Sequence, residues 1–138
     1  MHADGPDGQR VEAEVRASFA EPSLVDSAMA EVRSKLARAS HRPARLAALG
    51  AAWPGLRARL ESTLVPAATM ARWLAACGGA SHPADLGVSL GKLAADYRRA
   101  RLIRRRYTLL DCLEDLGLLD AAIAALFADG GFWQRLSR

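Results

Sequence analysis

The chain has 138 residues, a length that suits one domain, and its formal net charge at pH 7 is +4. Hydrophobic residues make up 51% of it, yet no stretch approaches the roughly 20 apolar residues that cross a bilayer, and no basic, apolar and small-residue leader is present. These features argue against a membrane span and predict a cytoplasmic protein in which the two cysteines, Cys77 and Cys112, are buried and reduced.

The pattern of apolar residues predicts the fold class. Apolar residues recur three or four positions apart, and no segment alternates with a period of two. We therefore expect an all-α protein, an irregular bundle of about seven short helices joined by short connections. Residues 11–133 are expected to form the helical domain, residues 1–10 a disordered N-terminal segment and residues 134–138 a frayed C-terminus.

The first half of the chain predicts four helices, separated by prolines. The first covers residues 9–20, the second starts at residue 22 or 23, the third covers residues 45–52 and the fourth leads from Leu56 to Pro66. The sequence Trp53-Pro54-Gly55 is expected to be a corner between the last two, because proline disrupts a helix interior.

A further helix is predicted to start at Pro66 and to end at the glycine pair 78–79. One helical turn is expected after Pro83, in the loop of residues 81–87. In the helix that starts at Pro66, the side chains expected to point inward are Met70, Trp73, Leu74 and Cys77.

Residues 89–117 hold the strongest helix signals. Ser89 suits the start of a helix whose apolar stripe continues to Tyr107, and Thr108 suits the start of a second helix, with Asp111 in a capping-box position. Gly117 suits its end. The side chains of this second helix that we expect to point inward are Leu109, Leu110, Leu113 and Leu116. The last predicted helix is capped by Asp120, and Phe132 and Trp133 are expected to fold back onto the core.

The two helices predicted in residues 89–117 form a helical hairpin, and they carry opposite charge. Six arginines stand between residues 98 and 106, whereas residues 109–129 hold five acids and no base. We expect Arg104 to lie beside the apolar stripe and to form an internal ion pair with an acid of the second helix. The acids considered are Asp111, Glu114 and Asp115. A contact with another domain or subunit, and nucleic-acid binding through the arginines, are the alternatives.

No motif assigns a catalytic, cofactor-binding or metal-ligating residue. The three histidines lack the spacing of a metal site, and the two glycine pairs follow helices instead of opening a phosphate-binding turn. The serines and cysteines form no recognisable nucleophile constellation.

The run RRRYTLLDCLEDLGLLD, residues 104–120, resembles the C-terminal signature of the sn-glycerol-1-phosphate dehydrogenases, a branch of the iron-containing alcohol dehydrogenase and glycerol dehydrogenase superfamily. Residues 74–89 resemble the turn that precedes the family's penultimate helices. The resemblance covers roughly residues 66–133. Six positions are singled out as signature residues and as candidates for ion pairs. They are Arg104, Arg105, Arg106, Tyr107, Thr108 and Asp111.

The resemblance implies part of a dehydroquinate synthase-like helical domain. The family reduces dihydroxyacetone phosphate to sn-glycerol 1-phosphate, in phospholipid biosynthesis, with NAD(P) and a divalent metal, zinc or nickel. This chain has no strand, glycine-rich turn and helix for a dinucleotide, and Asp7 stands where a metal-binding histidine would be expected. We therefore expect no cofactor on this chain alone and no activity without a missing or separate dinucleotide-binding domain.

Two other functions remain open from the sequence. The chain could be a small helical interaction module, or a homo-oligomer, that uses exposed apolar side chains; those considered are Trp53, Trp73, Phe132 and Trp133. It could also be an arginine-rich nucleic-acid binder, although no aromatic side chain lies inside the arginine run to stack on bases.

Overall fold

The computed structural model describes residues 8–136, and every regular element in this range is a helix, which confirms the all-α class. In chain order the elements are α1 (Gly8–Ser18), α2 (Pro22–Leu36), the short 3-10 helix η1 (Ala39–His41), α3 (Arg42–Thr63), α4 (Ala67–Ala76), the 3-10 helix η2 (Pro83–Leu86), α5 (Leu90–Ala100), α6 (Leu109–Asp115), α7 (Leu119–Phe127) and α8 (Phe132–Leu136). None of these helices is long and apolar enough to span a membrane.

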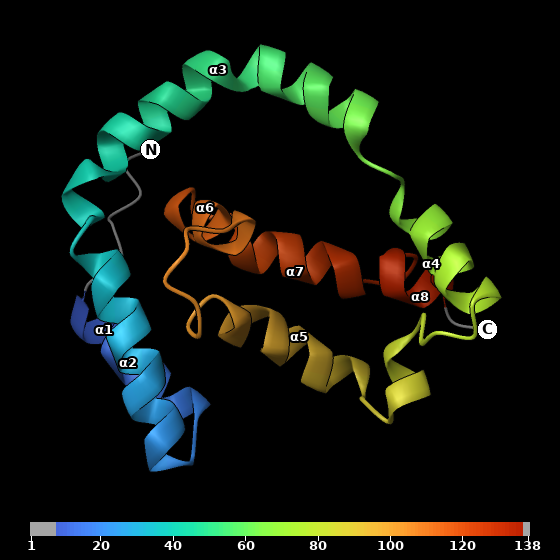
Figure 1. Ribbon diagram of the computed structural model, residues 1–138, viewed down its shortest axis with the longest axis horizontal. Helices are drawn as coiled ribbons and strands as arrows, with labels where there is room; N and C mark the ends of the chain where they lie inside the picture. Colours follow the sequence, from blue (N-terminus) through green and yellow to red (C-terminus); the bar gives the residue numbers. More distant parts are fainter. Residues whose placement is uncertain (1–7, 137–138) are drawn as a thin grey trace.

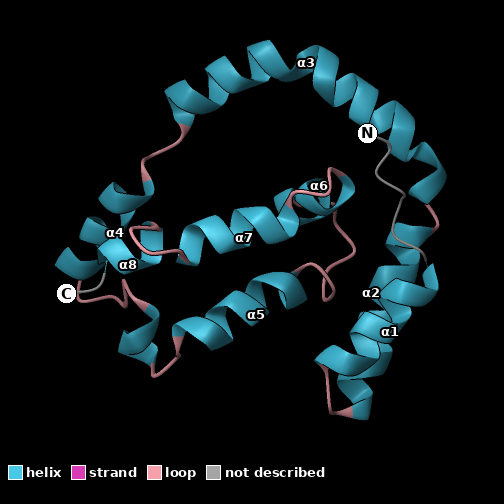
Figure 2. Ribbon diagram, turned by 180° about the vertical axis from the view of Figure 1, so that it is seen from behind, coloured by secondary structure: helices cyan, strands magenta, loops and turns pink. Residues whose placement is uncertain are grey.

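The helices follow an open path. Figure 1 shows α1 and α2 side by side at one edge, α3 arching over α6 and α7, and α4 beside α8 at the other edge. Figure 2 shows the same arrangement from behind, with α5 running beside α7.

The main core lies between α1 and α2. Val11 and Val15, four residues apart, form the buried stripe of α1, while Met29 and Val32 face it from α2. Leu102, from the loop after α5, is fully buried in the same cluster. The apolar spacing therefore predicted this pair correctly, although α1 begins at Gly8, inside the segment expected to be disordered. Residues 1–7 of that segment lie outside the described range.

Helix α3 contradicts the predicted corner at residues 53–55. It continues unbroken through Pro54 for 22 residues. A proline inside a helix removes one backbone hydrogen bond and bends the axis, and α3 is visibly curved in Figure 1. The residues on both sides are mostly good helix formers, chiefly alanine, leucine and arginine. Their preference for helix explains why the element bends instead of ending.

Helix α4 has the predicted position but not the predicted burial. It contains no buried residue, and Met70, Trp73 and Leu74 are 52%, 58% and 48% exposed. Cys77 is also exposed, while Cys112 is half-buried, so the expectation of two buried thiols was wrong for Cys77. The reason is that no other helix within residues 8–136 packs closely over this face.

The arginine-rich helix is shorter than predicted. Ser89 caps it as expected, since its hydroxyl accepts a hydrogen bond from the backbone N–H of Lys92 at 3.2 Å. However, α5 ends at Ala100, and the chain turns so that Leu102 enters the core while Ile103 is 51% exposed. Burial of Leu102 outweighs continuation of the stripe, so residues 103–107 are not helical.

Helix α6 is rotated relative to the prediction. Its buried residues are Asp111 and Asp115, whereas Leu109 and Leu116 are 72% and 41% exposed. The two aspartates lie four residues apart and so share one face, which is turned toward basic residues of α2 and α3. Gly117 ends the helix in the left-handed region, at φ 69°, as predicted.

The last two helices form a small aromatic cluster. Trp133 of α8 stacks on Phe127 of α7 at 6.3 Å between ring centroids, and Tyr97 of α5 meets Phe127 edge-on. The predicted return of Trp133 onto the fold is confirmed. Two details differ: Asp120 lies inside α7 instead of capping it, and residues 134–136, expected to be frayed, belong to α8.

Candidate functional site

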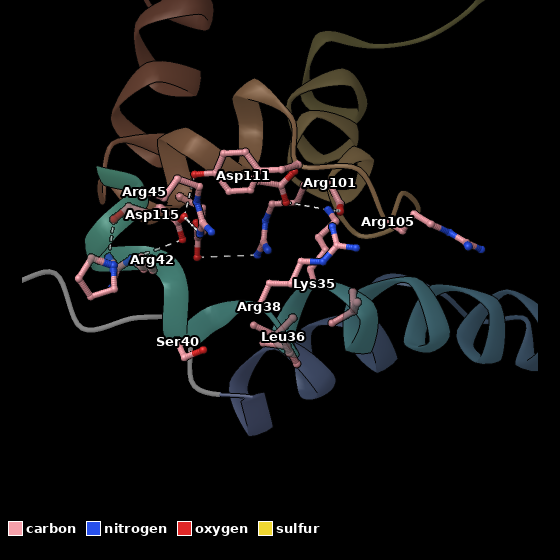
Figure 3. Close-up of a pocket in the computed structure, with 15 residues that line it drawn as sticks. Lys35, Leu36, Arg38, Ser40, Arg42, Arg45, Arg101, Arg105, Asp111 and Asp115 are labelled. Atoms are coloured by element: carbon pink, nitrogen blue, oxygen red, sulfur yellow. Dashed lines mark hydrogen bonds and ion pairs between the residues drawn. The ribbon is translucent and has the colours of Figure 1, made fainter. Parts of the chain in front are cut away.

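A cavity of about 530 Å³ lies where α6 meets the end of α2 and the start of α3. The side chains of α1 and of the loop after α5 complete its wall. Figure 3 shows charged side chains from these separate segments gathered around it. The basic residues that line it are Lys35, Arg38, Arg42, Arg45, Arg101 and Arg105, and the acidic ones are Asp111, Glu114 and Asp115.

Asp115 is the most heavily shared acid of the cavity. Its carboxylate accepts a hydrogen bond from Arg45 at 2.7 Å and one from the hydroxyl of Tyr107 at 2.7 Å. Arg42 pairs with the same carboxylate at 3.4 Å and also donates to the backbone carbonyl of Asp115. Because the side chain of Asp115 is only 8% exposed, these partners replace water around the charge. One carboxylate thus ties two guanidinium groups of α3 to α6.

Tyr107 completes this arrangement from the loop. The guanidinium of Arg45 lies over its ring, 4.4 Å from the centroid, in a cation–π contact. Tyr107 is 43% exposed as a residue, but its hydroxyl donates a hydrogen bond to the buried carboxylate. Partial burial and the hydrogen bond to Asp115 raise the pKa of Tyr107 well above its ordinary value. The phenol is therefore held in its protonated, donating form.

A raised pKa has a definite consequence for stability. A group whose pKa is higher in the folded state stabilises the fold below its ordinary pKa, about 10 for tyrosine, and loses that contribution as the pH rises further. We expect phenolate absorbance to show one tyrosine that resists ionisation above pH about 10, and Tyr107→Phe to remove it. If Tyr97→Phe removed it instead, the contact with Asp115 would not be the cause.

Asp111 forms a second buried ion pair and the cap of α6. Its Oδ1 atom lies 2.7 Å from Nζ of Lys35, at side-chain exposures of 10% and 15%. Its Oδ2 atom accepts hydrogen bonds from the backbone N–H of Thr108 at 2.8 Å and from the Thr108 hydroxyl at 2.7 Å. The predicted capping box at Thr108 and Asp111 is therefore present, and it orients the carboxylate toward α2.

Replacing Thr108 by alanine tests this cap. Loss of the hydroxyl bond should lower the free energy of unfolding by about 1 kcal/mol, measured by urea denaturation. Thr69→Ala on α4 is a matched control, because its hydroxyl accepts one bond from Arg72 at the surface. Its cost should stay within about 0.5 kcal/mol. Equal costs for the two variants would contradict a capping role for Thr108.

Arg101 joins the cavity to α1. Its side chain is 7% exposed and pairs with Glu14 of α1, while Glu114 of α6 lies 3.9 Å away. Lys35 also donates to the backbone carbonyl of Arg101. Glu114 pairs in turn with Arg10 at 2.7 Å. These bonds hold the loop after α5 between α1, α2 and α6.

The other predicted arginines behave differently from one another. Arg105 makes two hydrogen bonds to Glu31, at 3.0 and 3.1 Å, and Figure 3 shows its side chain pointing away from the cavity centre. This contact lowers the pKa of the Glu31 carboxyl. Arg104 and Arg106 are exposed and form no hydrogen bond or ion pair with the part of the chain that the structure describes. The expected placement of Arg104 beside the apolar stripe was wrong, because the helix ends before it.

Internal ion pairing of the arginine run is confirmed only in part. Arg98 pairs with Asp120 at 2.8 Å and Arg99 with Asp96 at 3.4 Å, both at the surface. The acids of α6 are instead neutralised mainly by α2 and α3. Arg104 and Arg106 pair with none of these acids and are exposed.

Sequence reasoning missed the basic residues of α2 and α3. Lys35, Arg38, Arg42 and Arg45 follow one another at intervals of three, four and three residues. That spacing places basic side chains on one side of a helical path. The signal was hidden because His41 and Pro43 indicate a break, although the chain stays helical around them as η1 and the start of α3.

The residues do not fit the zinc or nickel of the resembled family. Within residues 8–136, no three His, Cys, Asp or Glu side chains come together as a metal site would require. Asp7, which stands where the resembled family would have a metal-binding histidine, lies outside this range.

Comparisons with known proteins add no relative. No family model matches the chain, and neither the curated proteins nor the solved structures contain a match to it.

Proposed function

We propose that the chain is the helical, substrate-side portion of an NAD(P)-dependent oxidoreductase that resembles the sn-glycerol-1-phosphate dehydrogenases and acts on dihydroxyacetone phosphate or glycerol 1-phosphate. The observation that carries the proposal is that residues 104–120, which carry the family resemblance, lie at the charged cavity. Residues 104–120 supply Tyr107, Asp111 and Asp115, which line the charged cavity, and the two aspartates pair with Lys35 of α2 and Arg45 of α3.

The proposal requires a second domain. Hydride transfer needs a nicotinamide cofactor held against the substrate, and a dinucleotide site needs a strand followed by a glycine-rich turn and a helix. The metal of the family would also have to be held elsewhere, because the residues here do not fit it. We therefore expect the isolated chain to be inactive as a dehydrogenase.

Reconstitution tests the proposal. The chain is mixed with a separately produced dinucleotide-binding half of an sn-glycerol-1-phosphate dehydrogenase, with zinc or nickel, and both complex formation and NAD(P)H oxidation by dihydroxyacetone phosphate are measured. A complex that oxidises NAD(P)H, while neither component does so alone, supports the proposal. Absence of both complex and activity overturns it.

A protein-interaction function is the second candidate, favoured by one surface. Trp53, Leu60 and Leu64 of the α3 region are 49%, 36% and 66% exposed, and Met70, Trp73 and Leu74 of α4 are exposed as well. Phe132 and Trp133 do not belong to it, because they pack in the aromatic cluster. If the surface takes a partner or a second copy, the purified chain should self-associate or bind a hydrophobic dye. A monomer that leaves the dye dark would exclude this function.

A further inference from the structure

No helix between residues 8 and 136 packs along the length of α3. Its first turn is tied to Asp115 by Arg42 and Arg45, and η1 is the only element of this range that packs closely against it. Further along, Trp53 and Leu60 are 49% and 36% exposed. A helix in water owes most of its stability to the packing of one apolar face. A 22-residue helix that lacks such packing therefore requires a partner that covers it.

The exposed surface of the chain gives the size of the missing contact. The chain exposes 9626 Å², whereas a compact monomer of 14.8 kDa exposes about 7,000 Å². Nine residues lie outside the described range, and even a fully extended stretch of nine residues exposes only about 1,400 Å². The excess that remains, about 1,200 Å² per chain, lies in the range of about 1,000–2,500 Å² that each partner buries in a permanent homodimer.

The apolar residues of α3 form a narrow seam with the spacing of a coiled coil. Their intervals alternate between three and four residues for most of the helix, which is the repeat by which two helices interlock their side chains. A helix that lies on a membrane needs a broader apolar face. The spacing therefore favours another helix as the partner. The residues of the seam are Leu46, Leu49, Trp53, Leu56, Leu60 and, at the C-cap, Leu64.

We propose that α3 is the interface of a homodimer in which the two copies of this helix lie antiparallel. The seam is nearly symmetric about the midpoint between residues 54 and 55. An antiparallel pair centred there places Trp53 opposite Leu56 of the second copy and Leu49 opposite Leu60 of the second copy. Such a contact closes after two copies, because the same surface serves both.

Two features of the seam favour the antiparallel pair over a parallel one. A parallel pair in register would set Trp53 against Trp53, whereas the antiparallel pair sets the large ring against a leucine, so that large and smaller side chains alternate. Arg57 and Arg59 flank the seam on its two sides. In the antiparallel pair they lie opposite residues 50–52, which are Gly, Ala and Ala. The four arginines of the two copies are thus kept from one level of the interface, where their charges would repel.

This inference rests on the protein-interaction function proposed above and names its partner, a second copy of this chain. The two can fail separately. A monomer that binds a hydrophobic dye would overturn the dimer and leave the interaction function, with an acidic helix or an anionic lipid surface as the occupant. A monomer that leaves the dye dark would exclude both.

Sedimentation equilibrium of the whole chain tests the dimer. We expect twice the mass of 14.8 kDa, and a mass that changes little with added salt, because the seam is apolar. Trp53→Glu should weaken association at least about tenfold, since a charge would enter the centre of the interface twice. Ala58→Glu adds the same charge to an exposed residue of α3 that lies off the seam, and it should leave the dimer intact.

Engineered cysteines test the arrangement without depending on a disruptive charge. Cys77→Ser and Cys112→Ser first remove the two free thiols. Leu49→Cys and Leu60→Cys are then made in separate copies of that chain. Under mild oxidation, we expect a disulfide-linked dimer on a non-reducing gel when the two variants are mixed, and little when either is alone.

Three results would overturn the proposal. The first is a monomeric mass at every concentration. The second is equal weakening by Trp53→Glu and Ala58→Glu, which would place the contact outside the seam. The third is cross-linking by each cysteine variant alone at the level of the mixture, which would show that the two helices lie parallel.

Discussion

Asp115→Asn is expected to lower the free energy of unfolding by about 3–5 kcal/mol, the typical cost of removing one partner of a buried ion pair. The substitution keeps the size of the side chain but removes the only charge that Arg42 and Arg45 share. It also weakens the acceptor for the Tyr107 hydroxyl. Since a whole domain is stable by only about 5–15 kcal/mol, the variant should show a much lower denaturation midpoint.

Asp120→Asn provides the control for this loss. Asp120 also pairs with an arginine, Arg98, but its side chain is 84% exposed, so water can replace the bond. Such surface pairs contribute about 0–1 kcal/mol. Urea denaturation of both variants measures the contrast. If Asp115→Asn cost no more than Asp120→Asn, the aspartate would not hold α3 to α6, and the account of the cavity wall would be wrong.

Sequence reasoning predicted the buried faces of α1 and α2 but not the buried face of α6. In α1 and α2 the buried side chains are apolar and three or four residues apart, so periodicity located both helices and their inner faces. In α6 the same reasoning selected the leucines, yet the buried residues are Asp111 and Asp115. Hydrophobicity cannot predict a face that is buried by ion pairing.

The partners of these aspartates explain why the candidate site was only half predicted. The signature residues Tyr107 and Asp111 do lie at the cavity, and the Thr108 cap was read from local spacing alone. The bases that meet the acids stand 70 residues away for Arg45 and 76 for Lys35. A single sequence holds no signal that joins positions so far apart, whereas a capping box lies within one helical turn.

The helix that continues through Pro54, and the exposed tryptophans Trp53 and Trp73, also differ from the prediction. Proline predicts a break from local geometry, but a helix tolerates it when the neighbouring residues favour helix and the bend meets no obstacle. The exposure of Trp53, beside it, and of Trp73 on α4 had no counterpart in the expected bundle. The bundle was inferred from short connections, and the long α3 removes one of them.

Leu102→Ala should be the most costly apolar truncation outside the helices, at about 2–5 kcal/mol. Leu102 is fully buried with Val15 and Met29, although it stands in the loop after α5. Its removal would leave a void between α1 and α2 and would free the neighbouring Arg101 from its position beside Glu14.

Leu109→Ala is the matched comparison, because Leu109 is 72% exposed on the first turn of α6. Its cost should lie within about 0.5 kcal/mol in urea denaturation. The order of the two is the reverse of what the apolar stripe predicts, which places Leu109 inward and gives Leu102 no role. A larger loss for Leu109 than for Leu102 would restore the hairpin predicted from sequence, and it would remove Leu102 as the anchor that joins α5 to the core.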